Sequence, residues 1–280
     1  MLIRKRSPLW LLIRNVLLLA FVVVTVFPFY YAILNSFRPI RGLLDMNWLP
    51  DHLTLANWIS AFGPQSPVPR WLFNSIVVTL SITTLSVCFD SLAGYAFARR
   101  RFPGRNLFFF GIVIFGLTVP AALLIIPVYG MMANAQLINT YPALILPAAS
   151  SLGTFMMTQA ISDIPLDLDE AARLDGATDF DIFWRVVLPL IKPALAAVFI
   201  VLFLAHWNDF LYPLIVTNQE NMRTLTVGLY VMAPSDRTFG LPPPWDWITV
   251  SIAVQFIPVL IIFLIGQDYF TKGMALTGMK

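Results

Sequence analysis

Residues Glu170 to Leu190 read EAARLDGATDFDIFWRVVLPL and differ sharply from the rest of the chain. This stretch is polar, whereas strongly apolar segments lie on both sides of it. Between Asp167 and Arg185 the chain carries six carboxylates, two arginines and a run of aromatic residues. A very apolar chain is therefore interrupted by a stretch with the composition of a water-exposed amphipathic element.

The composition of the whole chain is that of an integral membrane protein. Of its 280 residues, 58% are apolar and only 12% are charged, and the mean hydropathy is +0.77. Soluble domains average about 25% charged and about 45–50% apolar residues. The net charge of +3 is small and no basic tract is present, so no nucleic-acid partner is expected. The single cysteine, Cys88, excludes an intrachain disulfide.

Six apolar runs are long enough to cross a bilayer, whose hydrocarbon core of about 30 Å requires about 20 residues of helix. We expect one all-α membrane domain over residues 1–280, with spans at about 9–34, 71–98, 106–131, 142–160, 191–217 and 247–267. The first run is longer than the apolar region of a signal peptide, so it is interpreted as a retained helix. Prolines inside the runs, such as Pro120, are expected to be tolerated where neighbouring helices satisfy the freed carbonyl group.

The distribution of Lys and Arg predicts the orientation in the membrane. With the N-terminus in the cytoplasm, thirteen of the eighteen basic residues lie on the cytoplasmic side. We therefore expect both termini and the 161–190 segment to be cytoplasmic. The loops predicted outside, 37–70 and 218–246, are rich in proline and tryptophan. An interfacial aromatic belt is expected at Trp71, Trp245 and Trp247.

Two short helices are expected within the polar segment. Acidic residues at Asp167 and Asp169 favour a helix start, and Gly176 favours its end. Thr178 and Asp181 have the spacing of a capping box at the start of a second helix. In that helix one apolar stripe is predicted from Phe180, Phe183, Trp184 and Val187.

A helix pair this short needs a surface to cover its apolar stripe, since such helices rarely persist alone in water. One alternative is a helix lying on the bilayer, but helices of that kind favour Lys and Arg on their polar face. This segment is mainly acidic. The pattern therefore indicates a protein partner in the cytoplasm.

The spacing of the segment resembles the EAA loop of binding-protein-dependent ABC importer permeases. It has Glu170-Ala171-Ala172, then three residues, Gly176, nine residues and Val186-x-Leu188-Pro189, with valine where the family has isoleucine. Further motifs make the chain similar to carbohydrate-uptake permeases such as the second permease subunit of maltose transporters. These motifs are Phe73-Asn74-Ser75, Ala93-Gly94-Tyr95-Ala96-Phe97-Ala98-Arg99, Leu137-Ile138-Asn139-Thr140 and Trp207-Asn208-Asp209-Phe210.

The resemblance implies the type I ABC importer permease fold, with six transmembrane helices and a cytoplasmic coupling loop at 161–190, in a bacterial or archaeal inner or plasma membrane. It implies that a cytoplasmic ATPase, in two copies, contacts Glu170, Ala171, Ala172, Asp175, Gly176, Leu188 and Pro189. ATP and Mg²⁺ are expected on that partner, because this chain has no G-x-x-x-x-G-K-[ST] phosphate loop. No cofactor is expected on this chain itself. A second permease subunit and an extracytoplasmic solute-binding protein complete the implied assembly.

Polar residues inside the spans are candidates for the solute path, since such groups are costly in a bilayer. Trp207, Asn208 and Asp209 combine an aromatic face with hydrogen-bonding groups, as sugar binding requires. For Asn208 and Asp209 an interhelical hydrogen bond that fixes packing is an equal alternative. That alternative is favoured for Asp90. Weaker path candidates are Tyr129, Gln255, Thr118 and Gln159. His206 has no partners at ligand spacing, so no metal site is expected.

The expected function is that of the permease subunit of an ATP-driven importer for a sugar or oligosaccharide. A sugar-alcohol phosphate such as glycerol phosphate is the alternative solute. A self-sufficient secondary carrier predicts an internal repeat and paired intramembrane carboxylates, and the sequence has no clear repeat. No H-E-x-x-H or G-x-S-x-G motif occurs, so the chain is not expected to be an enzyme.

Overall fold

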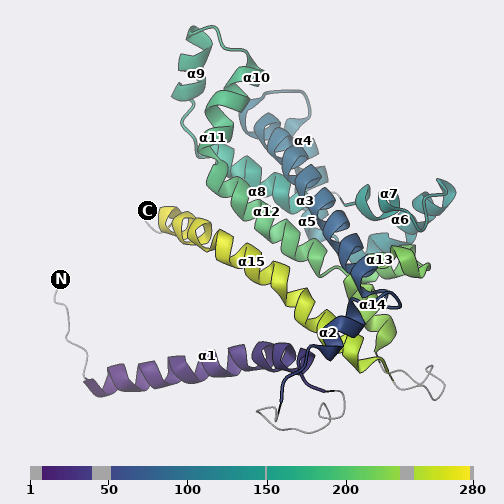
Figure 1. Ribbon diagram of the computed structural model, residues 1–280. Coiled ribbons are helices and arrows are strands. Elements are labelled where there is room, and N and C mark those ends of the chain that lie inside the picture. The colour runs from purple at the N-terminus through teal and green to yellow at the C-terminus, as the bar shows by residue number, and fades with distance from the viewer. Residues whose placement is uncertain (1–7, 40–51, 149, 234–242, 278–280) are drawn as a thin grey trace. The chain divides into compact units, whose positions relative to one another are not determined.

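The computed structural model describes residues 8–39, 52–148, 150–233 and 243–277, and all regular structure in these ranges is helical. Figure 1 shows the helices with the labels used below. The chain divides into two compact units. One comprises Met1–Pro69 and Leu229–Ile257, and the other comprises Arg70–Gly228 and Pro258–Lys280. The all-α prediction is confirmed.

The first unit contains α1 (Pro8–Ser36), α2 (Ala56–Ala61) and the start of α15 (Trp245–Thr277). Large apolar side chains are exposed along α1, as a lipid-facing helix requires. The buried Asn57 side chain in α2 donates to the carbonyl oxygens of Ser36 (3.2 Å) and Arg38 (2.7 Å). These bonds fix α2 to the last residue of α1 and to the segment that follows it.

The second unit holds the other helices, of which α3, α14 and α15 run on into the first unit. They are α3 (Val68–Arg99), α4 (Arg105–Phe108), η2 (Phe109–Ile114), α5 (Phe115–Thr118), α6 (Ala121–Asn134), α7 (Tyr141–Ile145), α8 (Ser151–Ser162), α9 (Asp167–Leu174), α10 (Asp179–Asp181), η3 (Ile182–Val187), α11 (Leu188–Leu190), α12 (Lys192–Trp207), α13 (Leu211–Val216), η4 (Glu220–Met222) and α14 (Leu225–Met232). Both η2 and η3 are π-helices, whereas η4 is a 3₁₀ turn.

Three of the described helices are long and apolar enough to cross a membrane: Leu9–Ser36, Val68–Arg99 and Trp245–Gly266. Two bent pairs add up to two more, if each pair is one span. These are Arg105–Thr118 with Ala121–Asn134, bent by 107°, and Asp179–Leu190 with Lys192–Trp207, bent by 76°. The count of six spans therefore stays a prediction.

The run predicted as one span at 106–131 is broken at Pro120. Val119 is extended (φ −79°, ψ 119°), because proline disfavours the helical conformation in the residue before it. The helix stops at Thr118 and starts again at Ala121 in a new direction. Pro120 therefore lies at a bend between two helices, and a single span at 106–131 stays a prediction.

The runs at 142–160 and 191–217 are also divided. Between α7 and α8 lies Pro147, and Ser150 begins α8 by accepting a hydrogen bond from the Gly153 amide (2.9 Å). At about 1.5 Å per residue, neither α7 nor α8 alone spans a hydrocarbon core. The later run ends as α12 at Trp207 and resumes as the short α13.

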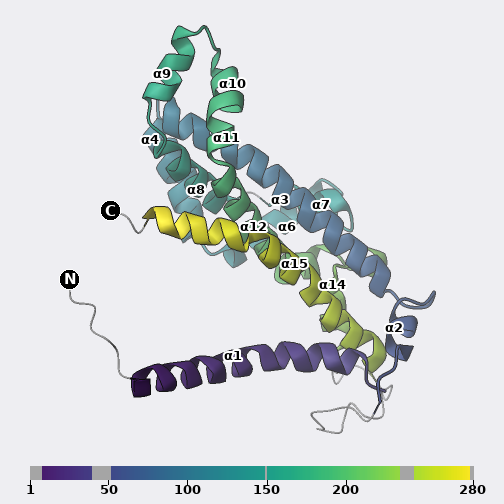
Figure 2. The ribbon, with the colours of Figure 1, turned by 60° about the vertical axis from the view of Figure 1, so that its left-hand side comes forward.

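Buried side chains from α3, α8, η3 and α12 form one core cluster in the second unit, and these helices lie side by side in Figures 1 and 2. Gly94 in α3 permits the closest approach, since a Cβ there would lie 2.7 Å from the Cβ of Met157 in α8. Trp71 is buried too, and its indole nitrogen donates to the carbonyl oxygen of Glu220 (2.8 Å). Trp71 therefore packs inside the protein and is not part of an interfacial belt.

Candidate functional site

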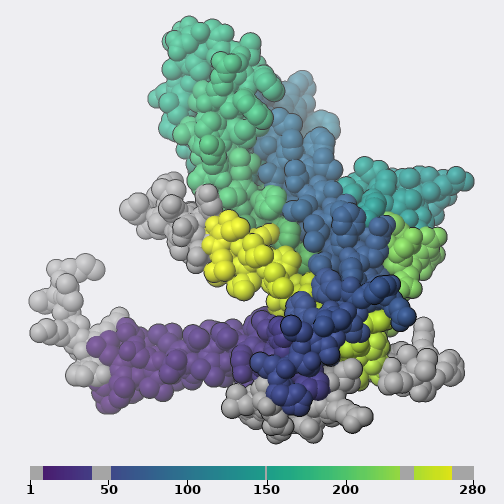
Figure 3. Space-filling model, viewed as in Figure 1, coloured from purple at the N-terminus to yellow at the C-terminus, as the bar shows by residue number. Residues whose placement is uncertain are grey.

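The predicted coupling loop forms one end of the second unit. Its helices α9 and α10 lie beyond the ends of α8 and α12 in the two ribbon views (Figures 1 and 2). In the space-filling view the same segment projects from the rest of the unit (Figure 3). It is thus accessible to another chain from several sides.

The first helix of the loop ends as the sequence predicts. Gly176 has φ +85°, in the left-handed region, and its amide donates to the carbonyl oxygen of Arg173 (3.0 Å). The amide of Ala177 donates to the carbonyl oxygen of Ala172 (3.0 Å). A glycine is favoured here because left-handed backbone brings a Cβ too close to the following carbonyl oxygen.

The second helix begins with the predicted capping box. The Thr178 hydroxyl oxygen accepts from the Asp181 amide (3.2 Å), and the Asp181 carboxylate accepts from the Thr178 amide (3.2 Å). The hydrogen bonds from Thr178 lower the pKa of Asp181 from its ordinary value. The charged carboxylate is thereby part of the cap.

The predicted apolar stripe of the second helix is only half right. Phe183 and Val187 are buried together with Ile182, but Phe180 and Trp184 are 69% and 58% exposed. The cause is η3, a π-helix with i→i+5 hydrogen bonding, which brings Ile182 and Val187 onto one face. The two exposed rings stack on each other, with centroids 6.2 Å apart.

The predicted coupling residues divide into an exposed set and a packed set. Ala172 and Leu188 are half-buried and pack against the core cluster. Leu174, whose exposure the sequence does not reveal, is 90% exposed at the end of α9. The exposed set is Glu170, Ala171, Asp175, Gly176 and Pro189.

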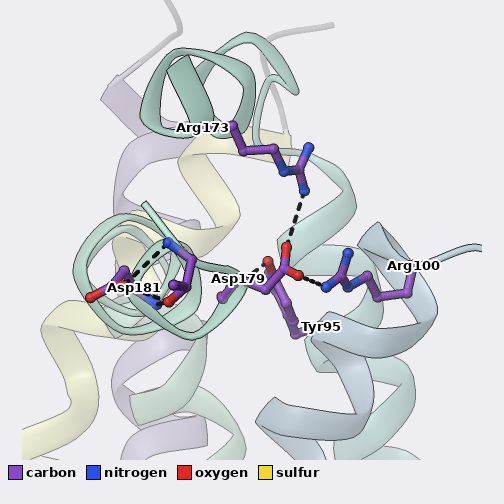
Figure 4. A network of polar contacts seen from close by, with 6 residues as sticks. Tyr95, Arg100, Arg173, Asp179 and Asp181 are labelled. Atoms are coloured by element: carbon purple, nitrogen blue, oxygen red, sulfur yellow. Dashed lines mark hydrogen bonds and ion pairs between the residues drawn. The ribbon is translucent and has the colours of Figure 1, made fainter. Parts of the chain in front are cut away.

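A polar network connects the loop with the end of α3 (Figure 4). The Asp179 carboxylate lies between Arg100, which follows α3, and Arg173 of α9, and it makes an ion pair with each. The hydroxyl of Tyr95 in α3 donates to the backbone oxygen of Asp179 (3.4 Å). Sequence reasoning counted Arg100 only toward orientation, although an arginine just after a span is the signal for such a contact.

The predicted solute-path group at 207–209 lies at the break between α12 and α13. The Trp207 ring is buried and stacks on Phe203, with centroids 5.7 Å apart, so it presents no open face to a sugar. The exposed Asn208 donates to the carbonyl oxygen of Leu204 (2.8 Å). The half-buried Asp209 accepts from the backbone amides that begin α13. The last two side chains therefore stabilise helix ends.

The weaker path candidates are dispersed. Tyr129 is exposed on α6 and Gln159 is exposed on α8, whereas the Thr118 hydroxyl donates to carbonyl oxygens of its own helix. Gln255 is half-buried on the part of α15 that belongs to the other unit. A role of these four side chains in the solute path stays a prediction.

Asp90 joins α3 to α8, as the packing interpretation predicts. The Thr154 hydroxyl donates to its carboxylate (2.6 Å), and the absence of a side chain at Gly153 leaves the carboxylate its space. A cavity of about 340 Å³ lies beside this pair, lined by hydroxyl groups and apolar side chains of α3, η2 and α8. None of the predicted path residues lines it.

Comparisons with known proteins agree on one family. The profile of the binding-protein-dependent transport system inner membrane component matches residues 90–276. The arabinooligosaccharides transport system permease protein AraQ of Halalkalibacterium halodurans is 37% identical, and the alignment covers 99% of each chain. The sn-glycerol-3-phosphate transport system permease protein UgpE of Agrobacterium fabrum is 34% identical, with coverage of 98% of this chain and 99% of its own. A solved chain from a bacterial ABC transporter that imports the acidic polysaccharide alginate has the same fold, with a TM-score of 0.83 at 23% identity over 96% of this chain and 99% of that chain.

Proposed function

Because this chain belongs to the family of inner membrane components of binding-protein-dependent transport systems, we propose that it is a permease subunit of an ATP-driven importer for a sugar or oligosaccharide. The observation that carries this proposal is the projecting α9–α10 segment, whose backbone is capped internally and whose side chains are largely exposed. Such a segment offers a rigid contact surface to another chain. Solute would pass by alternating access, driven by movement of that partner.

The partner that fits this segment is a cytoplasmic ATPase subunit in two copies. It would bind ATP and Mg²⁺, for which this chain has no phosphate loop. The acidic first turn of α9 favours a partner surface that carries basic residues, and the protruding Leu174 favours an apolar pocket within that surface. Glu170, Asp175 and Gly176 would form the rim of the contact.

The remaining partners follow from the family. A binding protein on the outer side would deliver the solute, and a second permease subunit would complete the path. In this arrangement both termini and the 161–190 segment are cytoplasmic, in agreement with the thirteen basic residues predicted on that side.

Two solute classes have support. The 37% identity to an arabinooligosaccharide permease favours an oligosaccharide, and the 34% identity to a glycerol-phosphate permease favours a phosphorylated polyol. The arabinooligosaccharide permease has the higher identity of the two. An oligosaccharide is therefore the first choice on this chain.

The test is purification of the tagged chain from its native membrane in mild detergent, followed by reconstitution into liposomes. We expect the complex to hydrolyse ATP and to accumulate arabino-oligosaccharide in an ATP-dependent way, with glycerol 3-phosphate as the comparison solute. Leu174→Asp should abolish both activities by releasing the ATPase. Leu53→Asp is the matched control, since Leu53 is also exposed but lies on the side predicted to be outside. A purified chain without any ATP-hydrolysing partner would refute the proposal.

A further inference from the structure

One ion pair in the second unit is almost completely shielded from solvent. Arg99 is the last residue of α3, and Asp169 lies in the first turn of α9. The Arg99 Nε and the Asp169 Oδ2 are 3.2 Å apart, and the two side chains are 3% and 1% exposed. The same guanidinium group donates through Nη2 to the backbone oxygen of Ile164 (2.7 Å), in the turn between α8 and α9.

Asp169 differs from the other acids of α9. Its neighbours Asp167 and Glu170 are exposed, as is usual for acids on a short surface helix. Neither carboxylate oxygen of Asp169 has a hydrogen-bond donor in the described part of the chain. The charge of Arg99 is thus what compensates its burial, and a buried charge without its partner is strongly unfavourable.

The pair fixes the orientation of α9 because the guanidinium fork holds two points at once. One is the Asp169 carboxylate in the helix, and the other is the Ile164 carbonyl group just before it. Because Asp169 is held against the protein, Glu170 on the other side of α9 is exposed. Arg99 therefore decides which side of α9 is presented to a partner.

Further contacts make the connection between α3 and the loop rigid. The rings of Tyr95 in α3 and Phe183 in η3 pack with centroids 5.2 Å apart, and both belong to the core cluster that includes Met157 of α8. Tyr95 and Arg100 also contact Asp179, as Figure 4 shows. The end of α3 thus packs against the loop, although about 70 residues separate them in the chain.

We propose that Arg99 is a positioning residue for transport, which through Asp169 and Ile164 transmits displacement of the loop directly to α3. Tyr95 and Arg100 also connect α3 with the loop, but their polar contacts are made at Asp179, whereas Arg99 is bonded to α9 itself and to the turn before it. This inference rests on the proposed function, since it assumes that an ATPase moves the loop.

The test uses the reconstituted complex and measures solute taken up per ATP hydrolysed, a ratio that a mere loss of folded protein does not change. Asp169→Asn alone leaves a buried unpaired arginine, and we expect poor assembly. The double variant Arg99→Gln, Asp169→Asn removes both charges, so assembly should recover. Its uptake per ATP should nevertheless fall about fivefold or more, the usual lower bound of coupling between two sites.

The matched control is Arg101→Gln, which removes an exposed cation just after α3 and should keep the wild-type ratio. Arg99→Lys retains the charge but loses the second point of the fork, so it should also lower the ratio. If the double variant does not assemble, the uptake per ATP of Arg99→Lys tests the inference in its place. A wild-type ratio in the assembled double variant, or in Arg99→Lys, would overturn the inference. A wild-type complex without ATP-dependent uptake would instead refute the proposed function.

Discussion

Replacement of Gly176 by valine tests the geometry of the coupling loop most directly. An added Cβ at this position meets no atom within 4 Å, so steric overlap with neighbours contributes nothing. The whole free-energy cost of the substitution therefore comes from the backbone φ of +85°. For an L-residue in the left-handed region this cost is roughly 1–2 kcal/mol. A β-branched side chain is disfavoured there more strongly still.

Such a cost acts on the turn that ends α9. It opposes the amide hydrogen bonds of Gly176 and Ala177 (3.0 Å each), and a change of 1–2 kcal/mol lowers the population of a closed turn about 5–30-fold. We expect uptake of solute to fall in the order glycine, asparagine, alanine, valine, since asparagine tolerates left-handed backbone. Insertion into the membrane should be unchanged.

Two measurements check this order. ATP-dependent uptake is measured in liposomes, and hydrogen exchange of the amides of residues 176 and 177 is measured on the purified chain, except at a substituted position. The asparagine variant is the matched control, because it adds a side chain of similar size without the same backbone cost. If Gly176→Asn is as inactive as Gly176→Val, side-chain volume at the partner surface decides the outcome, and the backbone argument is wrong.

The capping box and the α3–α8 contact give three further predictions. Thr178→Ala removes the acceptor of the Asp181 amide hydrogen bond. Since such a cap contributes about 1 kcal/mol, protection of that amide from hydrogen exchange should fall about fivefold. Unchanged protection would contradict the role of the cap. The pKa of Asp181 is lowered in the folded chain, so the stabilisation by its carboxylate is present above the ordinary carboxyl pKa and is lost as the pH falls through the lowered value. Protection of the Asp181 amide, corrected for intrinsic exchange, should therefore decrease only in acid. A loss of protection near neutral pH would refute this assignment. Gly94→Ala places a Cβ 2.7 Å from the Cβ of Met157 and should lower the free energy of unfolding by about 1–3 kcal/mol, measured by thermal melting. Gly130→Ala is the control, because an added Cβ there has no atom within 4 Å, and it should leave the stability unchanged. Equal melting temperatures of the two variants would show that α3 and α8 separate easily.

Membrane character and the local geometry of the coupling loop could be read from the sequence alone. The left-handed turn at Gly176 and the capping box at Thr178 depend on residues within three or four positions of each other. Local backbone preferences decide such features, so sequence patterns identify them well. The apolar stripe is predicted only half correctly, because the π-helix at 182–187 depends on how this segment packs against the core and not on local preferences.

The continuity of the spans could not be read in the same way. An apolar run of sufficient length is compatible with a straight helix or with two helices at a bend, and at Pro120 the second case holds. Trp207 shows the same limit for function, since its residue type suits sugar stacking but its ring is buried against Phe203. Residue type identifies what a side chain can do, and burial decides whether it is available.

A helical membrane protein with a polar segment between two apolar parts follows from composition and local turn chemistry, because these do not depend on distant residues. The pairing of Arg99 with Asp169, and the position of Asp179 between two arginines, depend instead on how distant segments pack. The partners of Arg99 and Arg100, which lie in the loop, are chosen by the packing of α3 against it. In that packed environment a charge must find a counter-charge, and several acids of α9 were equal candidates until one was buried.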